Sequence, residues 1–370
     1  MKLAALLMAL AWASSACATE GSPSAPAAQV ATGGQGVSAS GGAGTAAGGA
    51  AQGGSPASRF ARELLYENDL IIEAVAARPR RVHVDESHVY WVGSAYFRAP
   101  KNGSGTRERL ADFNYVLMPR AIQTDARNVY LKQETGLDVI PKDGSPRYFV
   151  AAPIEWGSTG AYYTSGGLIV FASNQCTRFA ALELDGSAPR LASFDAPWEV
   201  SGGTNVLVVG GLVYCVNEAH GLRWDPKTTT PELLFEMPLG HHSFVAMASN
   251  GSALLLTEGA TGGQKQNIRL LPLPAVPGSE PTIWCPGGEA RGNGGADHFD
   301  PARNALFWNR AGTLSPLDLM TCSLSGPQGQ PTVRLDYESQ GEDVQGFAGD
   351  ETYFYWGDES GVWRARKPDL

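Results

Sequence analysis

A repeated phrase constrains the fold of this chain more than any other feature. "VDESHVYWVG" runs from Val84 to Gly93, and "GDETYFYWGD" runs from Gly349 to Asp358. Both place a turn-forming Asp before an apolar stretch that ends in Tyr-Trp. Five weaker copies lie between them, and one residue anchors each of the seven: Tyr90, Tyr130, Val170, Tyr214, Leu255, Phe307 and Tyr355. Successive anchors are 40, 40, 44, 41, 52 and 48 residues apart, so one repeated unit fills most of the chain.

Each unit is typical of four short strands separated by turns. The second strand is apolar on both sides, as in "HVYWV", "LIVFA" and "LVYCV", and a third strand such as "GVWRAR" follows. A strand of this kind must be covered on both faces, and sheets stacked around an axis supply that cover. The composition agrees, because 45 Gly, 24 Pro and only 18% charged residues favour turns and strands over long helices. The sequence therefore predicts an all-β protein, a β-propeller of seven four-stranded blades, with six or eight blades as alternatives.

The best copies also resemble a known propeller repeat. In the Tyr-Trp-Thr-Asp type of repeat, a turn Asp precedes an apolar-Tyr-Trp strand, and a Gly-x-apolar-x-Arg strand follows. The segments from Asp85 to Trp91 and from Asp350 to Arg364 match this pattern well. The resemblance implies a propeller. Repeats of this type usually form six blades, and for this reason a six-bladed ring remains an alternative.

The two ends of the chain are expected to close the ring together. After the last anchor only residues 357–370 remain, enough for a third strand but not for a fourth. The segment "ELLYENDLIIEAV", from Glu63 to Val75, lies before the first unit and has the composition of a strand. We expect it to supply the missing outer strand, so that the last sheet is completed. The alternative is a helix from Ser58 to Tyr66 packed on the outside.

The first 17 residues, "MKLAALLMALAWASSAC", predict an exported protein. Lys2 precedes an apolar run over residues 3–13, and small residues then lead to Cys17. This layout is typical of a secretion signal and is too short for a membrane span. It also resembles a bacterial lipoprotein signal, which implies a lipid anchor on Cys17 and a place at the outer membrane or cell surface. Ordinary signal cleavage, giving a periplasmic or secreted protein, is the alternative, since Ser14 stands where such signals normally have an apolar residue.

The next segment predicts a tether. Residues 18–58 are almost entirely Ala, Gly, Ser, Thr, Pro and Gln, which cannot bury enough apolar surface to fold. A Gly-rich coil of about 40 residues spans roughly 35 Å, enough to hold a folded domain clear of a membrane. Residues 59–370 are then expected to form a single propeller domain.

The four remaining cysteines predict two disulfides, since an even number in an exported domain is compatible with complete pairing. Pairing of nearest neighbours, Cys176 with Cys215 and Cys285 with Cys322, is favoured because each pair lies about one repeat apart. A zinc site is the rival interpretation, and no C-x-x-C spacing supports it.

Charge and motif content limit the possible functions. The net charge of -9 argues against a nucleic-acid partner, which would require a basic face. The sequence holds no G-x-S-x-G elbow, H-E-x-x-H pair, P-loop or calcium loop of the D-x-D-x-D-G kind. We therefore expect a monomeric protein that binds a protein, peptide or glycan. The alternative is an enzyme, a metal-dependent lyase or hydrolase.

Candidate site residues gather where the innermost strands begin. In a propeller these strands line the central channel, and the loops that precede them form the rim of one face. Superposition of the repeats brings eleven residues toward that rim: Arg80, Arg81, Arg120, Trp198, Glu199, His241, His242, Asp297, His298, Glu342 and Asp343.

Two interpretations of this set stay open. The imidazoles and carboxylates suit a divalent metal, with His242 and His298 as the expected ligands. The other interpretation makes them solvated channel residues and turn caps. Structural roles are also expected for residues that recur in several repeats. Trp91, Trp308 and Trp356 are expected to pack between blades, and Asp85, Asp125 and Asp350 are expected to cap turn amides.

Overall fold

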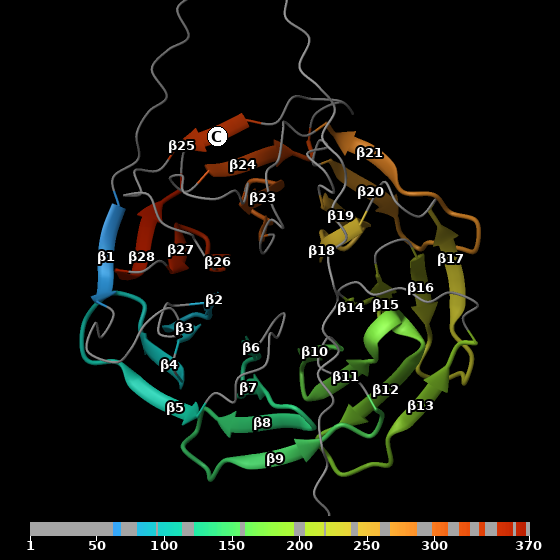
Figure 1. Ribbon diagram of the computed structural model, residues 1–370, viewed down its shortest axis with the longest axis horizontal. Coiled ribbons are helices and arrows are strands. Elements are labelled where there is room, and N and C mark those ends of the chain that lie inside the picture. The colour runs from blue at the N-terminus through green and yellow to red at the C-terminus, as the bar shows by residue number, and fades with distance from the viewer. Residues whose placement is uncertain are drawn as a thin grey trace, which may run out of the picture. The chain divides into compact units, whose positions relative to one another are not determined.

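A computed structural model describes residues 62–67, 80–93, 95–112, 122–155, 160–195, 204–217, 220–237, 243–259, 267–286, 298–309, 318–325, 333–336, 346–357 and 360–367. These residues form seven four-stranded antiparallel sheets. Figure 1 shows the sheets as blades around a common axis. The prediction of an all-β propeller with seven blades is confirmed. No helix in the described ranges is long and apolar enough to cross a membrane.

The first three blades follow the order of the chain. Blade 1 consists of β2 (Arg80–Val84), β3 (His88–Val92), β4 (Ala95–Pro100) and β5 (Glu108–Asp112). Blade 2 consists of β6 (Ile122–Thr124), β7 (Asn128–Lys132), β8 (Gly136–Pro141) and β9 (Tyr148–Ala151). Blade 3 consists of β10 (Ala161–Ser165), β11 (Leu168–Ala172), β12 (Arg178–Glu183) and β13 (Arg190–Ser193), with a short 3-10 helix, η2 (Asn174–Cys176), between β11 and β12.

Blades 4 to 6 have the same organisation. Blade 4 consists of β14 (Asn205–Val209), β15 (Leu212–Val216), β16 (His220–Trp224) and β17 (Glu232–Glu236). Blade 5 consists of β18 (Ser243–Ser249), β19 (Ala253–Gly259), β20 (Ile268–Pro272) and β21 (Thr282–Cys285). Blade 6 consists of β22 (His298–Asp300), β23 (Ala305–Asn309), β24 (Asp318–Ser323) and β25 (Val333–Asp336).

Blade 7 joins the two ends of the domain. It consists of β26 (Gly346–Gly349), β27 (Tyr353–Gly357), β28 (Gly361–Arg366) and, on the outside, β1 (Arg62–Glu67). β1 runs antiparallel to β28, with Arg62 opposite Ala365, and Arg364 forms a 2.7 Å ion pair with Glu63. The predicted closing strand is thus confirmed over residues 62–67, and the alternative helix is wrong there.

The seven sequence anchors all lie in the second strands of their blades. Each anchor is nearly or completely buried, because the second strand is covered on both sides. In blade 1, Tyr90 packs toward blade 2, whereas Trp91 packs toward blade 7. In blade 7, Tyr355 packs toward blade 1 and Trp356 toward blade 6. The second strand is apolar on both sides because each side packs against a neighbouring blade, as the sequence predicts. The expected packing roles of Trp91 and Trp356 are confirmed.

The core is divided among the junctions between blades. Seven clusters of buried apolar side chains occur, and each combines residues from two successive blades. Contacts between innermost strands run without a break from β2 through β6, β10, β14, β18, β22 and β26 back to β2. The first and last repeats are therefore neighbours, and β2 lies beside β26 although Val84 and Gly346 are 262 positions apart in the sequence.

Candidate functional site

The aspartates of the repeat fix the turns that follow the innermost strands. Asp85 accepts hydrogen bonds of 2.8 Å from the backbone amides of Ser87 and His88, and one of 2.7 Å from the hydroxyl of Tyr90. Burial raises the pKa of the Asp85 carboxyl, but bonds from Lys142, Tyr90 and the amides outweigh this and leave the pKa well below its usual value. The predicted capping role is confirmed.

Asp125 and Asp350 repeat this arrangement. Each caps two backbone amides at 2.8 Å, and each accepts a hydrogen bond from a tyrosine five residues later, Tyr130 at 2.8 Å and Tyr355 at 2.9 Å. The tyrosine of the anchor position therefore has a polar partner for its buried hydroxyl, as a buried tyrosine requires.

In three blades, an aspartate that follows or ends the innermost strand pairs with a lysine from the next blade. Asp85 pairs with Lys142 of blade 2 at 2.8 Å, and Asp350 pairs with Lys101 of blade 1 at 2.9 Å. A third pair joins Asp300 of blade 6 to Lys367 of blade 7. Each lysine directly follows the third strand of its blade. Sequence reasoning missed these residues, although their common position after the third strand was a detectable signal.

His298, the one predicted metal ligand with a described side chain, lies at the junction of blades 6 and 7. The ammonium of Lys367 is 2.9 Å from its Nε2, and its ring meets Phe354 edge to face at 6.4 Å between centroids. Burial, and then the charge of Lys367, lowers the pKa of His298 to about 3. His298 is thus a neutral acceptor for Lys367.

His83 occupies the same position in blade 1, two residues before the turn aspartate. Its Nε2 lies 3.0 Å from Oγ1 of Thr124 in blade 2, and burial lowers its pKa to about 4. His83 and His298 therefore share a role: each connects its own blade to the next one through Nε2.

The polar groups around His298 are engaged in contacts between blades. A pocket of about 490 Å³ adjoins it, and Asp300, Asp350 and Glu351 line that pocket. Asp300 and Asp350 already bind Lys367 and Lys101, and Nε2 of His298 accepts from an ammonium. Within the described residues no three His, Cys, Asp or Glu side chains gather closely enough to hold a metal ion.

Disulfides join two other pairs of blades, with the pairing that the sequence favours. Cys176 bonds Cys215 between blades 3 and 4, and Cys285 bonds Cys322 between blades 5 and 6. The loop that carries Cys176 departs from ordinary backbone geometry, because Gln175 and Cys176 have φ angles of 74° and 60°. Such conformations persist only where the surroundings hold them.

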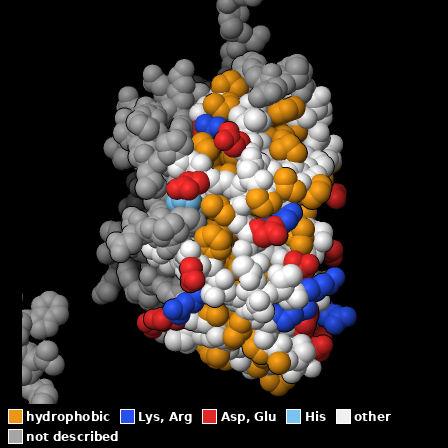
Figure 2. Space-filling model, turned by 90° about the vertical axis from the view of Figure 1, so that its right-hand side faces the viewer, with side chains coloured by type: hydrophobic (Ala, Val, Ile, Leu, Met, Phe, Trp, Pro, Cys, Tyr) orange, Lys and Arg blue, Asp and Glu red, His pale blue; other side chains and the backbone are white. Residues whose placement is uncertain are grey.

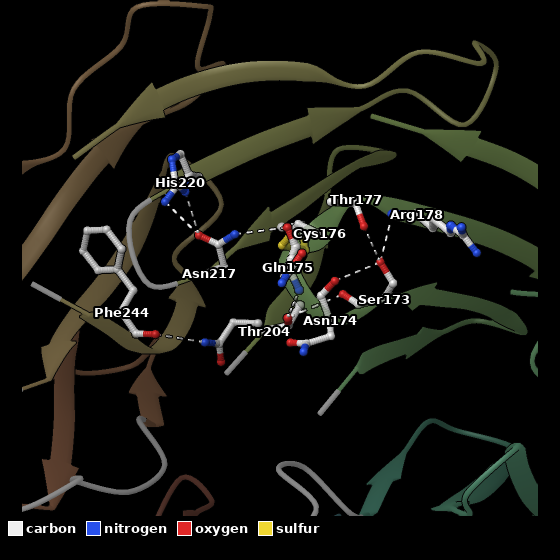
Figure 3. Close-up of a disulfide and its surroundings, with 12 residues drawn as sticks. Ser173, Asn174, Gln175, Cys176, Thr177, Arg178, Thr204, Asn217, His220 and Phe244 are labelled. Atoms are coloured by element: carbon white, nitrogen blue, oxygen red, sulfur yellow. Dashed lines mark hydrogen bonds between the residues drawn. A yellow bond between two sulfur atoms is a disulfide. The ribbon is translucent and has the colours of Figure 1, made fainter. Parts of the chain in front are cut away.

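Figure 3 shows what holds this loop. Asn217 of blade 4 donates from its amide to the carbonyl of Gln175 at 3.0 Å and accepts from the backbone amide of His220 at 2.9 Å. The hydroxyl of Thr204 accepts from the amide of Gln175 at 3.2 Å. Burial lowers the pKa of His220. Blades 3 and 4 are thus joined by a disulfide and by hydrogen bonds that fix the loop of Cys176.

A groove lies between the outer parts of blades 1 and 2. We call it the blade 1–2 groove; it has a volume of about 630 Å³ and is lined by residues 109–112 of β5, residues 133–135, Asp138, Arg147 and Phe149. Phe149 lies on the outer strand β9 and is 49% exposed. Sequence reasoning missed this groove, because it is formed by strands of two different repeats.

Outer strands elsewhere expose single apolar side chains. Leu191 of β13 is 49% exposed, and Ile283 of β21 is also exposed, as is Val276 in the loop between β20 and β21. Figure 2 shows the side of the ring that carries β17 and β21, where hydrophobic side chains are interspersed with charged ones. An exposed apolar residue alone is therefore ordinary for this surface, and the combination with a groove distinguishes Phe149.

Most predicted rim residues lie outside the described residues. Arg80 and Arg81 belong to β2, but only their backbones are described. Arg120, Trp198, Glu199, His241, His242, Asp297, Glu342 and Asp343, together with the side chain of Trp308, fall outside the described part. The same holds for the predicted signal, Cys17 and the tether. Their roles stay predictions.

Comparisons with known proteins support the fold. No protein-family model and no curated protein matches the chain. Among solved structures, a catalytically inactive virginiamycin B lyase from Staphylococcus aureus with quinupristin aligns at 12% identity and a TM-score of 0.61, over 84% of this chain and 100% of the lyase.

Two further structures are similar. YCF48 from Cyanidioschyzon merolae aligns at 11% identity and a TM-score of 0.54, over 84% of this chain and 99% of its own. The extracellular domain of a one-component system from B. thetaiotaomicron aligns at 10% identity and a TM-score of 0.54, over 85% of this chain and 41% of its own. Similarity at these identities establishes the fold and nothing about activity.

Proposed function

We propose that this chain is an exported β-propeller that binds a protein, peptide or glycan, and that a lipid on Cys17 tethers it to a membrane. Export is supported by the two disulfides, because such bonds persist in oxidising compartments. It is also supported by the fold shared with an extracellular bacterial domain. In this proposal the protein acts as a monomer. It also has no nucleic-acid partner, in keeping with its net charge of -9.

The observation that carries the binding function is the blade 1–2 groove. It offers an exposed aromatic ring beside both cationic and anionic side chains, among them Arg109, Arg147 and Asp138. Binding sites generally combine an apolar surface with a few polar groups that fix orientation. By contrast, the buried histidines and lysines described at the junctions bind partners in neighbouring blades. Their chemistry is thus used to hold the ring together.

A binding screen tests this function. The purified protein is screened against an array of immobilised oligosaccharides and a library of phage-displayed peptides. We expect at least one ligand whose binding is lost in Thr135→Arg, which places a long charged side chain in the groove. Ser187→Arg, which adds the same side chain to an exposed turn of blade 3, serves as the control and should bind normally. If neither collection yields a ligand, the proposed binding function is wrong.

The alternative function is a metal-dependent lyase or hydrolase. It is favoured by the shared fold of a lyase and by the pocket beside His298. It requires His298 to release the ammonium of Lys367, and for that reason we rank it second. Metal analysis of the purified protein distinguishes the two functions. Stoichiometric metal that is lost in His298→Ala or His242→Ala would favour the enzyme.

A further inference from the structure

We propose that the blade 1–2 groove binds a neutral oligosaccharide, with one sugar ring stacked on Phe149. This inference rests on the proposed binding function and specifies its ligand. Three features of the groove carry it: a supported aromatic ring with an open surface, a mixture of hydrogen-bond donors and acceptors around that ring, and the near balance of their charges.

The ring of Phe149 lies against the backbone of β8. A Cβ atom added to Gly136 would lie 2.7 Å from Cζ of Phe149, so the ring occupies space that any other residue would fill. The pairing of β8 with β9 holds the two strands in this register, with Asp138 opposite Phe149. One side of the aromatic group is thus supported by a strand while about half of its surface faces solvent.

A similar pair in blade 4 shows what this arrangement does elsewhere in the ring. Gly221 of β16 lies beneath the ring of Phe235 of β17, since an added Cβ would lie 2.1 Å from that ring. Phe235 is only 4% exposed, because Phe244 of blade 5 packs on it edge to face. Phe149 is supported in the same way but is 49% exposed, so its open surface is available to a ligand.

Polar groups surround Phe149 on both sides of the groove. From blade 1, Arg109 and Asp112 project from β5 as an exposed ion pair. From blade 2, Gln133 donates to Asp138 at 2.7 Å, and Arg147 reaches across to the carbonyl of Leu110. Guanidinium groups donate hydrogen bonds, whereas carboxylates accept them. A sugar hydroxyl does both, and so it can pair with either kind of group.

The charge pattern favours a neutral ligand. The groove contains two arginines, Arg109 and Arg147, and three carboxylates, Asp112, Glu134 and Asp138. Because positive and negative side chains are mixed, the groove offers no uniformly charged surface that would favour an anionic or a cationic ligand. A peptide would need apolar pockets for alternate side chains, whereas among the described residues that line the groove Phe149 is the only large apolar side chain that is exposed. A pyranose ring, with C–H bonds on its face and hydroxyls on its edge, matches both the aromatic surface and the polar rim.

Titration calorimetry with three neutral probes, cellohexaose, mannohexaose and hexa-N-acetylchitohexaose, tests the inference. We expect at least one probe to bind with one-to-one stoichiometry. Phe149→Ala should weaken that binding about tenfold, the effect of losing one aromatic stack. Leu191→Ala is the matched control, because Leu191 has the same 49% exposure and also lies on an outer strand. It should leave the dissociation constant unchanged. Equal unfolding midpoints for the two variants would exclude a folding defect as the cause.

The other outcomes separate this inference from the proposed function. If no oligosaccharide binds, but a phage-derived peptide binds and depends on Phe149, the sugar assignment is wrong and the binding function stands. If an oligosaccharide binds equally well to Phe149→Ala, the site is elsewhere and this inference is overturned. If neither class of ligand binds, both the inference and the proposed function are overturned.

Discussion

Lys367 and Asp300 form an ion pair of 2.7 Å between blades 7 and 6, and their side chains are only 0% and 1% exposed. Equivalent pairs join Asp350 to Lys101 and Asp85 to Lys142. Three successive junctions around the closing blade are thus held by ion pairs. Two junctions on the other part of the ring are held by disulfides. The repeat therefore uses two kinds of polar or covalent connection in addition to its apolar clusters.

Removal of the Lys367 ammonium should destabilise the ring strongly. In Lys367→Met, Asp300 keeps Arg303 as a partner but loses its buried lysine. We expect the free energy of unfolding to fall by about 3 kcal/mol, because a buried carboxylate loses most of its compensation. Arg190→Ala, which breaks the partly exposed pair with Glu183, should cost less than about 1 kcal/mol. Urea denaturation measures both values, and equal losses would contradict the buried role of Lys367.

The disulfide between blades 3 and 4 should stabilise the fold substantially. Its cysteines, Cys176 and Cys215, are separated by 39 residues in sequence. Closure of a loop of this length restricts the unfolded chain, so the double variant Cys176→Ser/Cys215→Ser should lose about 3 to 4 kcal/mol of unfolding free energy. The measurement is urea denaturation without reductant. A double variant as stable as the parent would show that the bond adds nothing to the junction.

The bridging histidines predict a pH dependence of stability. The folded pKa is about 3 for His298 and about 4 for His83, below the ordinary value of 6.5. Between these values the unfolded chain binds more protons, so the stability from the neutral imidazoles is complete above about pH 6.5 and declines as the pH falls toward 4. Each histidine contributes up to about 1.4 kcal/mol per pH unit in that window.

The variant His83→Gln/His298→Gln tests this dependence. Glutamine does not titrate, so the unfolding free energy of the variant should fall less steeply than that of the parent between about pH 6.5 and pH 4. Denaturation curves at several pH values give the two slopes. Identical slopes would mean that neither imidazole is protonated on unfolding, contrary to the junction geometry. Asp300, Asp350 and Arg303 also face His298, and they remain unchanged in this comparison.

The lipid tether is tested by a change at Cys17. Cells that produce Cys17→Ser should release the protein into a soluble fraction, because the sulfur that would carry the lipid is gone. The parent protein should remain with the membranes and should enter the detergent phase on phase partition. If the parent is soluble and identical to the variant in both assays, ordinary signal cleavage replaces lipidation.

The propeller could be predicted because every repeat contains an apolar second strand that must be buried on both faces. An apolar second strand such as that of Tyr90 and Trp91 needs two covered faces, and a propeller meets this demand at each junction. The closing strand followed from the missing fourth strand of the last unit, and the disulfides from a spacing of about one repeat.

The connections between blades were harder to predict. Lys101, Lys142 and Lys367 follow their third strands in similar positions, but their partners lie in other repeats. Alignment of the repeats places His298 on an innermost strand but does not give the direction of its side chain, which contacts Lys367 of blade 7. The blade 1–2 groove had no local signal at all, since Phe149 belongs to a short outer strand whose neighbours are set by the ring.

Hydrogen exchange with mass spectrometry tests the central claim, that the blade 1–2 groove is where this propeller binds its ligand. The protein is compared with and without the tightest-binding probe among cellohexaose, mannohexaose and hexa-N-acetylchitohexaose. We predict slower exchange in peptides that cover residues 108–112 and 133–149, and no change over the outer strands at residues 190–193 and 282–285. Protection confined to other blades, or none at saturating probe, would contradict the claim.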